Sequence, residues 1–303
     1  MRWRKLGRIF RAAGQQPWMQ SHTSMPFAEP LDGNLLRIWF TPRDGQNRSH
    51  LAWLEIDVAL PTAIRRLSSK PALAPGEQGR FDETGAMGSW LTRYGGERRH
   101  YYIGWSRSAS KPYHIAIGLA VGRNGETDFV RHGAGPILDR SDLDPVMVST
   151  PCVLRERECW HMWYLSVTAW PDSSQPPHYD LRHAVGADGL AWQPDSRRCI
   201  VFEHPGECAI ARPCVLRDED RWRMWFCYRG LDFPYRVGYA ESPDGRSWTR
   251  MDALAGIDVS DSGWDSGMIA YPFVFDHGGS RYMLYAGGGY GREGMGLAVL
   301  EQD

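Results

Sequence analysis

The chain has 303 residues, and its 35 basic and 36 acidic side chains nearly cancel. This balance gives no support for nucleic acid or an anionic membrane surface as the main partner. Fourteen Trp, thirteen Tyr and 33 Gly are typical of many strands joined by tight turns, and the six Cys show neither a CxxC pair nor metal-ligand spacing.

The first eleven residues are basic, but the apolar run of about 7 to 15 residues that an export signal needs does not follow. No stretch approaches the roughly 18 apolar residues of a membrane span, so we expect a cytoplasmic protein. Residues 3–10 have two interpretations: a strand that pairs near residues 296–300, or a basic amphipathic membrane anchor. The strand is favoured because it would close an open sheet edge in the last repeat described below.

A short aromatic motif recurs five times and predicts five equivalent strands. Large apolar residues alternate with polar ones in each copy, which is the period of a strand and not of a helix. The copies lie about 60 residues apart, at residues 37–40, 100–103, 161–164, 223–226 and 282–285.

Each copy lies inside a larger unit of four predicted strands. An apolar strand precedes it, most clearly at residues 151–155 and 213–217. A third strand and an Asn-Gly or Asp-Gly hairpin turn follow, and a fourth strand begins near Phe129, Trp192 or Trp248. Four antiparallel strands repeated radially make a propeller blade. We therefore predict that residues 1–303 form one all-β domain, a five-bladed β-propeller whose ring is closed by the N-terminal strand.

The long connections predict which face carries the functional site. Connections after the second strands cover residues 41–49, 168–178, 229–234 and 287–293, whereas those between first and second strands are short. Function gathers on elaborate loops held by a rigid scaffold. We therefore expect the site on this face, around the axis.

Acidic residues recur just before the first strands and are candidates for acid/base chemistry. Clustered carboxylates repel one another and burial raises their pKa, so one can act as an acid while another acts as a base. The alternative is that several are ordinary turn or cap residues. The set comprises Glu29, Glu83, Asp144, Glu207 and Asp265, and we expect its members to converge at one mouth of the axis.

Aromatic and basic residues near these acids are candidates for substrate binding. Flat rings beside carboxylates suit sugars, and arginine suits a carboxylate or a phosphate; alternatively, some of the Trp side chains pack between blades. Arg212 precedes the axial Pro213, and because an unpaired buried charge is costly, we expect it to contact Glu207, another acid of the set or a bound anion. The full set of substrate-binding candidates is Glu83, Trp90, Trp105, Arg212, Arg229, Trp264, Asp265 and Tyr271.

The predicted blades, together with the Ala28-Glu29-Pro30 segment that opens the first, resemble five-bladed glycoside hydrolases of the arabinofuranosidase/xylosidase, invertase and mannoside phosphorylase families. The resemblance covers the whole chain as architecture. It implies Glu29 as general base and Asp144 as the residue that tunes the acid. The Glu-Gly-Pro segment of the family's acid has no match here, and Glu207 lies in Gly206-Glu207-Cys208.

Three functions remain open. The first is hydrolysis of a glycoside or sugar conjugate, with Glu29 as base and Glu207 or Asp144 as acid. The second is a sugar-phosphate or nucleotide-sugar enzyme, including phosphorylase-type transfer, because Arg212 and Arg229 are expected at the same mouth. The third is a non-catalytic carbohydrate-binding propeller. No cofactor and no metal ligands are expected, although the resemblance allows a structural calcium ion on the axis.

Overall fold

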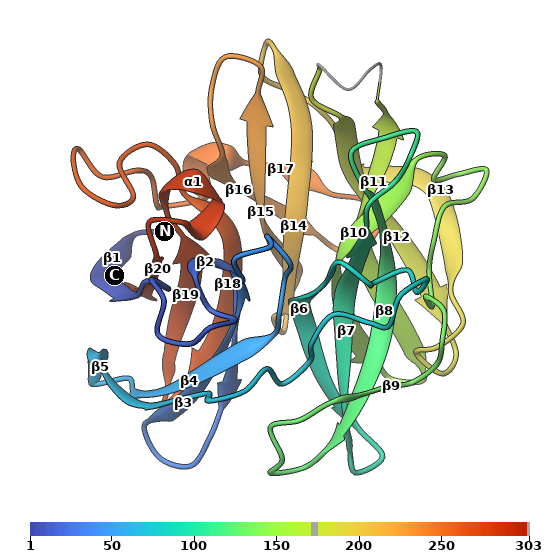
Figure 1. Cartoon of the computed structure of the whole chain (residues 1–303). Helices are drawn as coiled ribbons and strands as arrows, with labels where there is room; N and C mark the ends of the chain where they lie inside the picture. Colours follow the sequence, from blue (N-terminus) through green and yellow to red (C-terminus); the bar gives the residue numbers. More distant parts are fainter. Residues whose placement is uncertain (171–174, 302–303) are drawn as a thin grey trace.

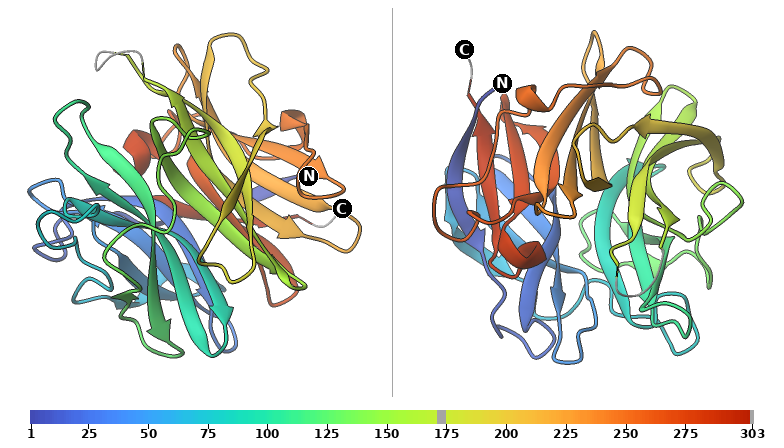
Figure 2. Two further views of the ribbon diagram at one scale, coloured as in Figure 1. Left: turned by 90° about the vertical axis from the view of Figure 1, so that its right-hand side faces the viewer. Right: turned by 90° about the horizontal axis from the view of Figure 1, so that it is seen from above.

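The computed structural model describes residues 1–170 and 175–301, and their regular structure is almost entirely β-strand. Within these residues the helical elements are short: α1 (Gly288–Gly291) and the 3₁₀ turn η1 (Asp252–Leu254). The views in Figures 1 and 2 show the sheets fanned around a common centre. Among the described residues, no helix is long and apolar enough to cross a membrane.

Three sheets have four antiparallel strands each. One consists of β2 (Ser21–Pro30), β3 (Leu35–Arg43), β4 (Ala52–Asp57) and β5 (Leu60–Leu67). The next consists of β6 (Gly85–Tyr94), β7 (Glu97–Ser106), β8 (His114–Arg123) and β9 (Val130–Arg131). The third has the order β1 (Trp3–Phe10), β20 (Met295–Leu300), β19 (Ser280–Ala286) and β18 (Ala270–His277).

The remaining strands form one eight-stranded sheet built from two antiparallel groups. The first group is β10 (Met147–Glu156), β11 (Cys159–Ala169), β12 (His178–Gly186) and β13 (Gln193–Ile200). The second is β14 (Glu207–Arg217), β15 (Trp222–Gly230), β16 (Arg236–Ser242) and β17 (Thr249–Arg250). A parallel pair between Tyr179 of β12 and Ala209 of β14 joins the two groups.

The strands β2, β6, β10, β14 and β18 contact one another in cyclic order around a central axis, and β18 closes the circle against β2. Each of them has a register shift at the same point of its pairing with the next strand. In four of these bulges the residue before a proline has a positive φ: Met25 (54°), Thr150 (44°), Arg212 (55°) and Tyr271 (57°). Such conformations cost about 1–3 kcal/mol each and cluster at functional sites.

The recurring aromatic motif lies in the second strand of each unit, as predicted, and its large side chains fill the core. Trp39, Trp163 and Trp225 are fully buried. The predicted turns are also present, and Gly189 and Gly245 take the positive φ that these turns require.

The N-terminal strand β1 pairs antiparallel with β20, with Trp3 opposite Leu300, so the predicted closure is confirmed. Trp3 is buried, packs edge-on against Trp225 with ring centroids 6.1 Å apart, and donates its Nε1–H to the Ala255 carbonyl at 3.0 Å. The alternative of a membrane anchor is therefore wrong for this segment.

Candidate functional site

A cavity of about 660 Å³ opens at the axis, on the face that carries the long connections. Its floor includes Met25, Thr150, Ala211 and Tyr271, which lie at or beside the strained bulges. Of the eight non-glycine residues with positive φ in the described part of the chain, five line this axial cavity. Backbone strain is therefore concentrated where a ligand would bind. Residues 171–174 of the predicted connection 168–178 lie outside the described residues.

Tyrosines form much of the cavity wall: Tyr113, Tyr179, Tyr235, Tyr271 and Tyr290. The hydroxyl groups of Tyr179 and Tyr235 hydrogen-bond to each other. Burial is the main cause that raises the pKa of Tyr179 to about 12 and the pKa values of Tyr235 and Tyr271 well above their ordinary range. These phenols stay protonated at neutral pH, so they offer neutral hydroxyl groups and ring faces, which suit a polyhydroxylated ligand.

Three arginines, Arg43, Arg107 and Arg229, also line the axial cavity, whereas its described lining contains no Asp or Glu. Arg229 donates from Nε to the Tyr179 hydroxyl at 3.2 Å, and its guanidinium carbon lies 5.5 and 5.7 Å from the ring centroids of Tyr179 and Tyr235. Arg43 donates to the Asn47 Oδ1 at 2.9 Å. The site can thus bind anionic oxygens, but its described lining supplies no carboxylate acid or base.

Arg212 lies fully buried at the bulge of β14 and spans the axis. It donates to the Ser89 hydroxyl at 2.8 Å and to the Pro26 carbonyl at 3.3 Å, and its backbone N–H donates to the Thr150 hydroxyl. Its guanidinium carbon lies 5.9 Å from the Phe273 ring centroid. Arg212 therefore connects β14 to the four other strands of the ring. The expected contact with an acid is not present among the described residues: the two terminal nitrogens donate to neutral oxygens, and the buried Nε has no hydrogen-bond partner.

Three buried acids that precede the inner strands form the same structural contact, which we term the Tyr–Asp clasp. In each clasp a tyrosine of the second strand donates its hydroxyl to the carboxylate, and a cation from an outer strand approaches that carboxylate. The three clasps are Tyr102, Asp82 and Arg131; Tyr164, Asp144 and Arg182; and Tyr285, Asp265 and Lys5. The clasps turn these acids into their own sheets, away from the cavity lining.

The acids were expected to converge at one mouth of the axis, but their hydrogen bonds hold them away from the axial cavity. Glu29 lies four residues beyond Met25 on β2, about 13 Å along the strand, near the opposite end of the ring. Its carboxylate accepts hydrogen bonds from Arg93 and Arg98 at 2.8 and 2.7 Å and from the Trp39 indole at 3.2 Å. It is a partner of arginines between two sheets and does not line the axial cavity.

Glu207 is likewise held away from the cavity. Both of its carboxylate oxygens accept from Arg250 of β17, at 2.9 and 3.0 Å, and one also accepts the backbone N–H groups of Glu203 and His204. Glu83, the predicted acid of the second repeat, accepts the Gly79 N–H in a surface turn. Its neighbour Asp82 takes the equivalent clasp position.

The predicted binding residues divide into two groups. Trp105, Arg229 and Tyr271 line the cavity, and Trp105 donates its Nε1–H to the Ser49 hydroxyl at 3.2 Å. Trp90 and Trp264 do not: Trp90 packs on Phe273 with ring centroids 5.1 Å apart, and Trp264 stacks on Tyr285 at 5.4 Å. Packing between side chains explains both positions.

No described group of three or more His, Cys, Asp or Glu side chains is arranged to hold a metal ion. The charged group on the axis is Arg212, and a cation there disfavours a second cation nearby. The residues do not fit the calcium ion that the resemblance allowed.

Several cavity residues were missed at the sequence level, although a pattern marks them. A Pro lies one or two residues before a Tyr at the start of three of the third strands: Pro112 and Tyr113, Pro177 and Tyr179, Pro234 and Tyr235. The repetition of this pair at one point of the unit is a signal for a shared wall.

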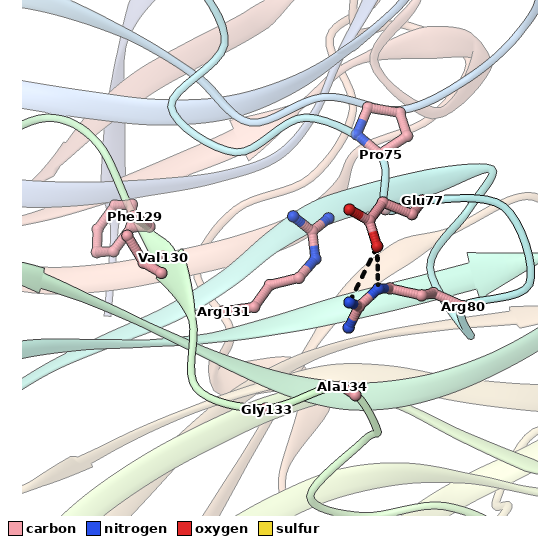
Figure 3. A pocket seen from close by; sticks show the side chains of 9 residues that line it. Pro75, Glu77, Arg80, Phe129, Val130, Arg131, Gly133 and Ala134 are labelled. Carbon is pink, nitrogen blue, oxygen red and sulfur yellow. Dashed lines mark hydrogen bonds and ion pairs between the residues drawn. The ribbon is translucent and has the colours of Figure 1, made fainter.

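A second, more open pocket of about 540 Å³ lies on the outer side of β9 (Figure 3). Its charged side chains are already paired: Arg80 with Glu77 at 3.0 Å, and Arg131 with the clasp residue Asp82 at 2.7 Å. Because these charges are neutralised within the protein, the axial cavity is the better candidate site.

Comparison with known proteins shows relatives and a shared fold. No protein-family model matches the chain. It is 41% identical over 301 residues to the uncharacterized protein MT1551 of Mycobacterium tuberculosis strain CDC 1551, covering 99% of this chain and 100% of that protein. It is 40% identical to the uncharacterized protein Rv1502 of Mycobacterium tuberculosis strain H37Rv, with the same coverage.

Three solved structures illustrate the fold. A glycoside hydrolase superposes with a TM-score of 0.77 at 15% identity, covering 99% of this chain and 93% of that one. A glycosyl hydrolase from Bacteroides ovatus gives 0.76 at 12% identity, with the same coverage. A Bombyx mori GH32 beta-fructofuranosidase in complex with sucrose gives 0.65 at 11% identity, covering 96% of this chain and 62% of that enzyme. At these identities the likeness shows the fold.

Proposed function

Because the chain belongs to the family of the mycobacterial proteins MT1551 and Rv1502 and has the fold of glycoside hydrolases, we propose that it is a carbohydrate-active propeller that binds a sugar or sugar conjugate in the axial cavity. Its cytoplasmic location stays a prediction, which cell fractionation tests.

We count five blades by taking the two antiparallel groups of the eight-stranded sheet as two blades. One parallel residue pair between β12 and β14 is a slight link compared with the antiparallel pairing inside each group. The cyclic contacts of the five inner strands support the same count. On this count every blade contributes to the axial cavity.

The single observation that carries the proposal is the composition of the cavity wall. Tyrosine rings and hydroxyl groups, together with Trp105, surround a space large enough for a small ligand. Aromatic faces cover the apolar faces of sugar rings, while hydroxyl groups exchange hydrogen bonds with sugar hydroxyls. The mode of binding differs from the sequence-based mechanism, since Glu29, Asp144 and Glu207 all have partners away from the cavity.

A panel of monosaccharides and oligosaccharides, followed by isothermal titration calorimetry, tests the proposal. We expect a sugar ligand whose affinity falls about tenfold or more when Trp105→Ala removes an aromatic wall. Tyr94→Ala is the matched control, because Tyr94 is an exposed aromatic residue at the turn between β6 and β7, away from the cavity. Equal losses in both variants, or no sugar ligand across the panel, would contradict the proposal.

Aryl glycosides incubated with the same preparations decide whether binding leads to hydrolysis. Release of the aryl alcohol that is lost in Trp105→Ala and kept in Tyr94→Ala supports a hydrolase. Binding without release supports the non-catalytic function, and phosphate-dependent release supports phosphorylase-type transfer.

A further inference from the structure

The arginines at the axis differ from the other buried arginines of this protein. Arg37, Arg98 and Arg250 each pair with a buried glutamate at 2.7 to 2.9 Å. Arg43 and Arg229, by contrast, have no carboxylate within 4.0 Å among the described residues; Arg43 contacts an amide oxygen and Arg229 a phenol and a thiol. A poorly compensated charge in a partly buried site is costly unless an opposite charge arrives.

Arg43 and Arg229 both line the axial cavity, and the charges of both reach its Tyr113. Tyr113, on the wall, has a pKa raised chiefly by burial, and the charges of Arg229 and Arg43 both lower it in part. All three residues line the axial cavity, so an anion bound there is attracted by both arginine charges. Tyr113 itself packs against Trp170, with the rings tilted and their centroids 5.1 Å apart.

The surroundings of Arg43 are cationic as well. The pKa of the neighbouring His22 is lowered to about 4, first by burial and then by Arg43 and Arg292. Burial also lowers the pKa of Arg43, and Arg292 acts in the same direction. Arg107 adds a third arginine to the cavity lining, and Arg212 lies beside the floor residue Ala211. This accumulation of positive charge has no balancing acid in the described lining.

We propose that the axial cavity binds a phosphate monoester, with the phosphate group between Arg43 and Arg229 beside the Tyr113 hydroxyl. The inference rests on the proposed function for the sugar part of the ligand. A phosphate monoester carries about −1.5 to −2 charges at pH 7, which suits two arginines better than the single charge of a carboxylate. Guanidinium groups bind phosphate oxygens through paired N–H donors, and the phenol supplies a further donor.

Isothermal titration calorimetry with glucose 1-phosphate, inorganic phosphate, glucuronate and glucose tests the proposal. We expect glucose 1-phosphate to bind more tightly than glucuronate, and glucuronate more tightly than glucose. Arg43→Met and Arg229→Met should each weaken glucose 1-phosphate binding about 10- to 100-fold, while Arg229→Lys should lose less because it keeps the charge. Arg123→Met, an exposed arginine on β8, is the matched control and should bind like the wild type.

The thermal unfolding temperature of each variant shows whether the variant is folded. If an arginine variant unfolds near the wild-type temperature, its lower affinity reflects the lost ligand contact and not a loss of folding. Equal affinity for glucose 1-phosphate and glucose overturns the phosphate site while leaving the sugar proposal intact. Inorganic phosphate binding that depends on Arg43 and Arg229, without any sugar ligand, supports the site and rejects the carbohydrate function. Phosphate binding that is the same in all variants overturns the inference.

Discussion

Removing the hydroxyl group of Tyr164 tests whether Asp144 is a structural or a catalytic acid. Asp144 is fully buried, accepts the Tyr164 O–H at 3.0 Å and lies 3.6 Å from the Arg182 Nε. A hydrogen bond to a charged group contributes about 1.5–3 kcal/mol, and without it the Asp144 Oδ2 keeps the longer hydrogen bond from the Ser141 hydroxyl, at 3.4 Å. We expect Tyr164→Phe to lower the free energy of unfolding by this amount. With a urea m-value of about 3 kcal/mol per molar, the midpoint falls by about 0.5–1 M.

Urea unfolding followed by tryptophan fluorescence measures this change. In the Asp144→Asn background the effect of Tyr164→Phe should be smaller, because the acceptor no longer carries a charge. Tyr282→Phe is the matched control, since the Tyr282 hydroxyl has no hydrogen bond among the described residues and its ring stacks on Phe275. If Tyr164→Phe shifted the midpoint no more than the control, the clasp would not hold Asp144, and its catalytic role would be open again.

Three further predictions concern the buried Glu29, the buried Asp180 and the pairing of β1 with β20. Glu29→Gln leaves Arg98 without its charge partner, so we expect a loss of about 3–5 kcal/mol in urea unfolding with unchanged ligand binding; unchanged stability would contradict the structural role. Burial raises the pKa of Asp180 to about 6 despite Arg198 at 2.7 Å, so the native state holds this proton more tightly than the unfolded chain. Wild-type stability should therefore fall relative to Asp180→Asn by about 2 kcal/mol as the pH rises from 4 to 6, and parallel pH profiles would refute this. Deleting residues 1–11 exposes the edge of β20 and should cause aggregation in size-exclusion chromatography; a monodisperse deletion variant with wild-type stability would argue against the closing role of β1.

The strand order was predictable because each unit repeats a buried aromatic strand. The exact position of the acid in each repeat was harder to predict. A β-bulge adds residues to the inner strand, and no fixed sequence pattern marks it. The pairing of Cys152 with Trp163 and of Trp90 with Tyr101 makes Ser89 the counterpart of Pro151. Seven residues before Pro151 stands Asp144, and seven before Ser89 stands Asp82, one residue before the predicted Glu83.

The positions of the acids in the sequence did not predict whether their side chains point into the axial cavity or into their own sheets. Asp144 and Asp265 stand before inner strands, yet each is bound by a tyrosine and a cation of its own sheet. Each tyrosine lies 20 residues after its acid, a constant spacing that marks the pair, whereas the cations have no constant spacing and Lys5 is 260 residues from Asp265. The face on which the axial cavity opens was predictable from loop length, and Arg229 and Tyr271 line this cavity because they lie at strand ends that meet at the axis.

The pairing of β1 with β20 also has a consequence for synthesis on the ribosome. Strand β1 is synthesised before its partner β20, which is complete only at Leu300. At about 5–20 residues per second, the first strand waits roughly 15–60 s for that partner. During this interval Trp3 and Ile9, both buried in the finished protein, remain exposed to water. The basic side chains of β1, Arg4, Lys5 and Arg8, provide the charge by which unpaired strands resist association with other chains.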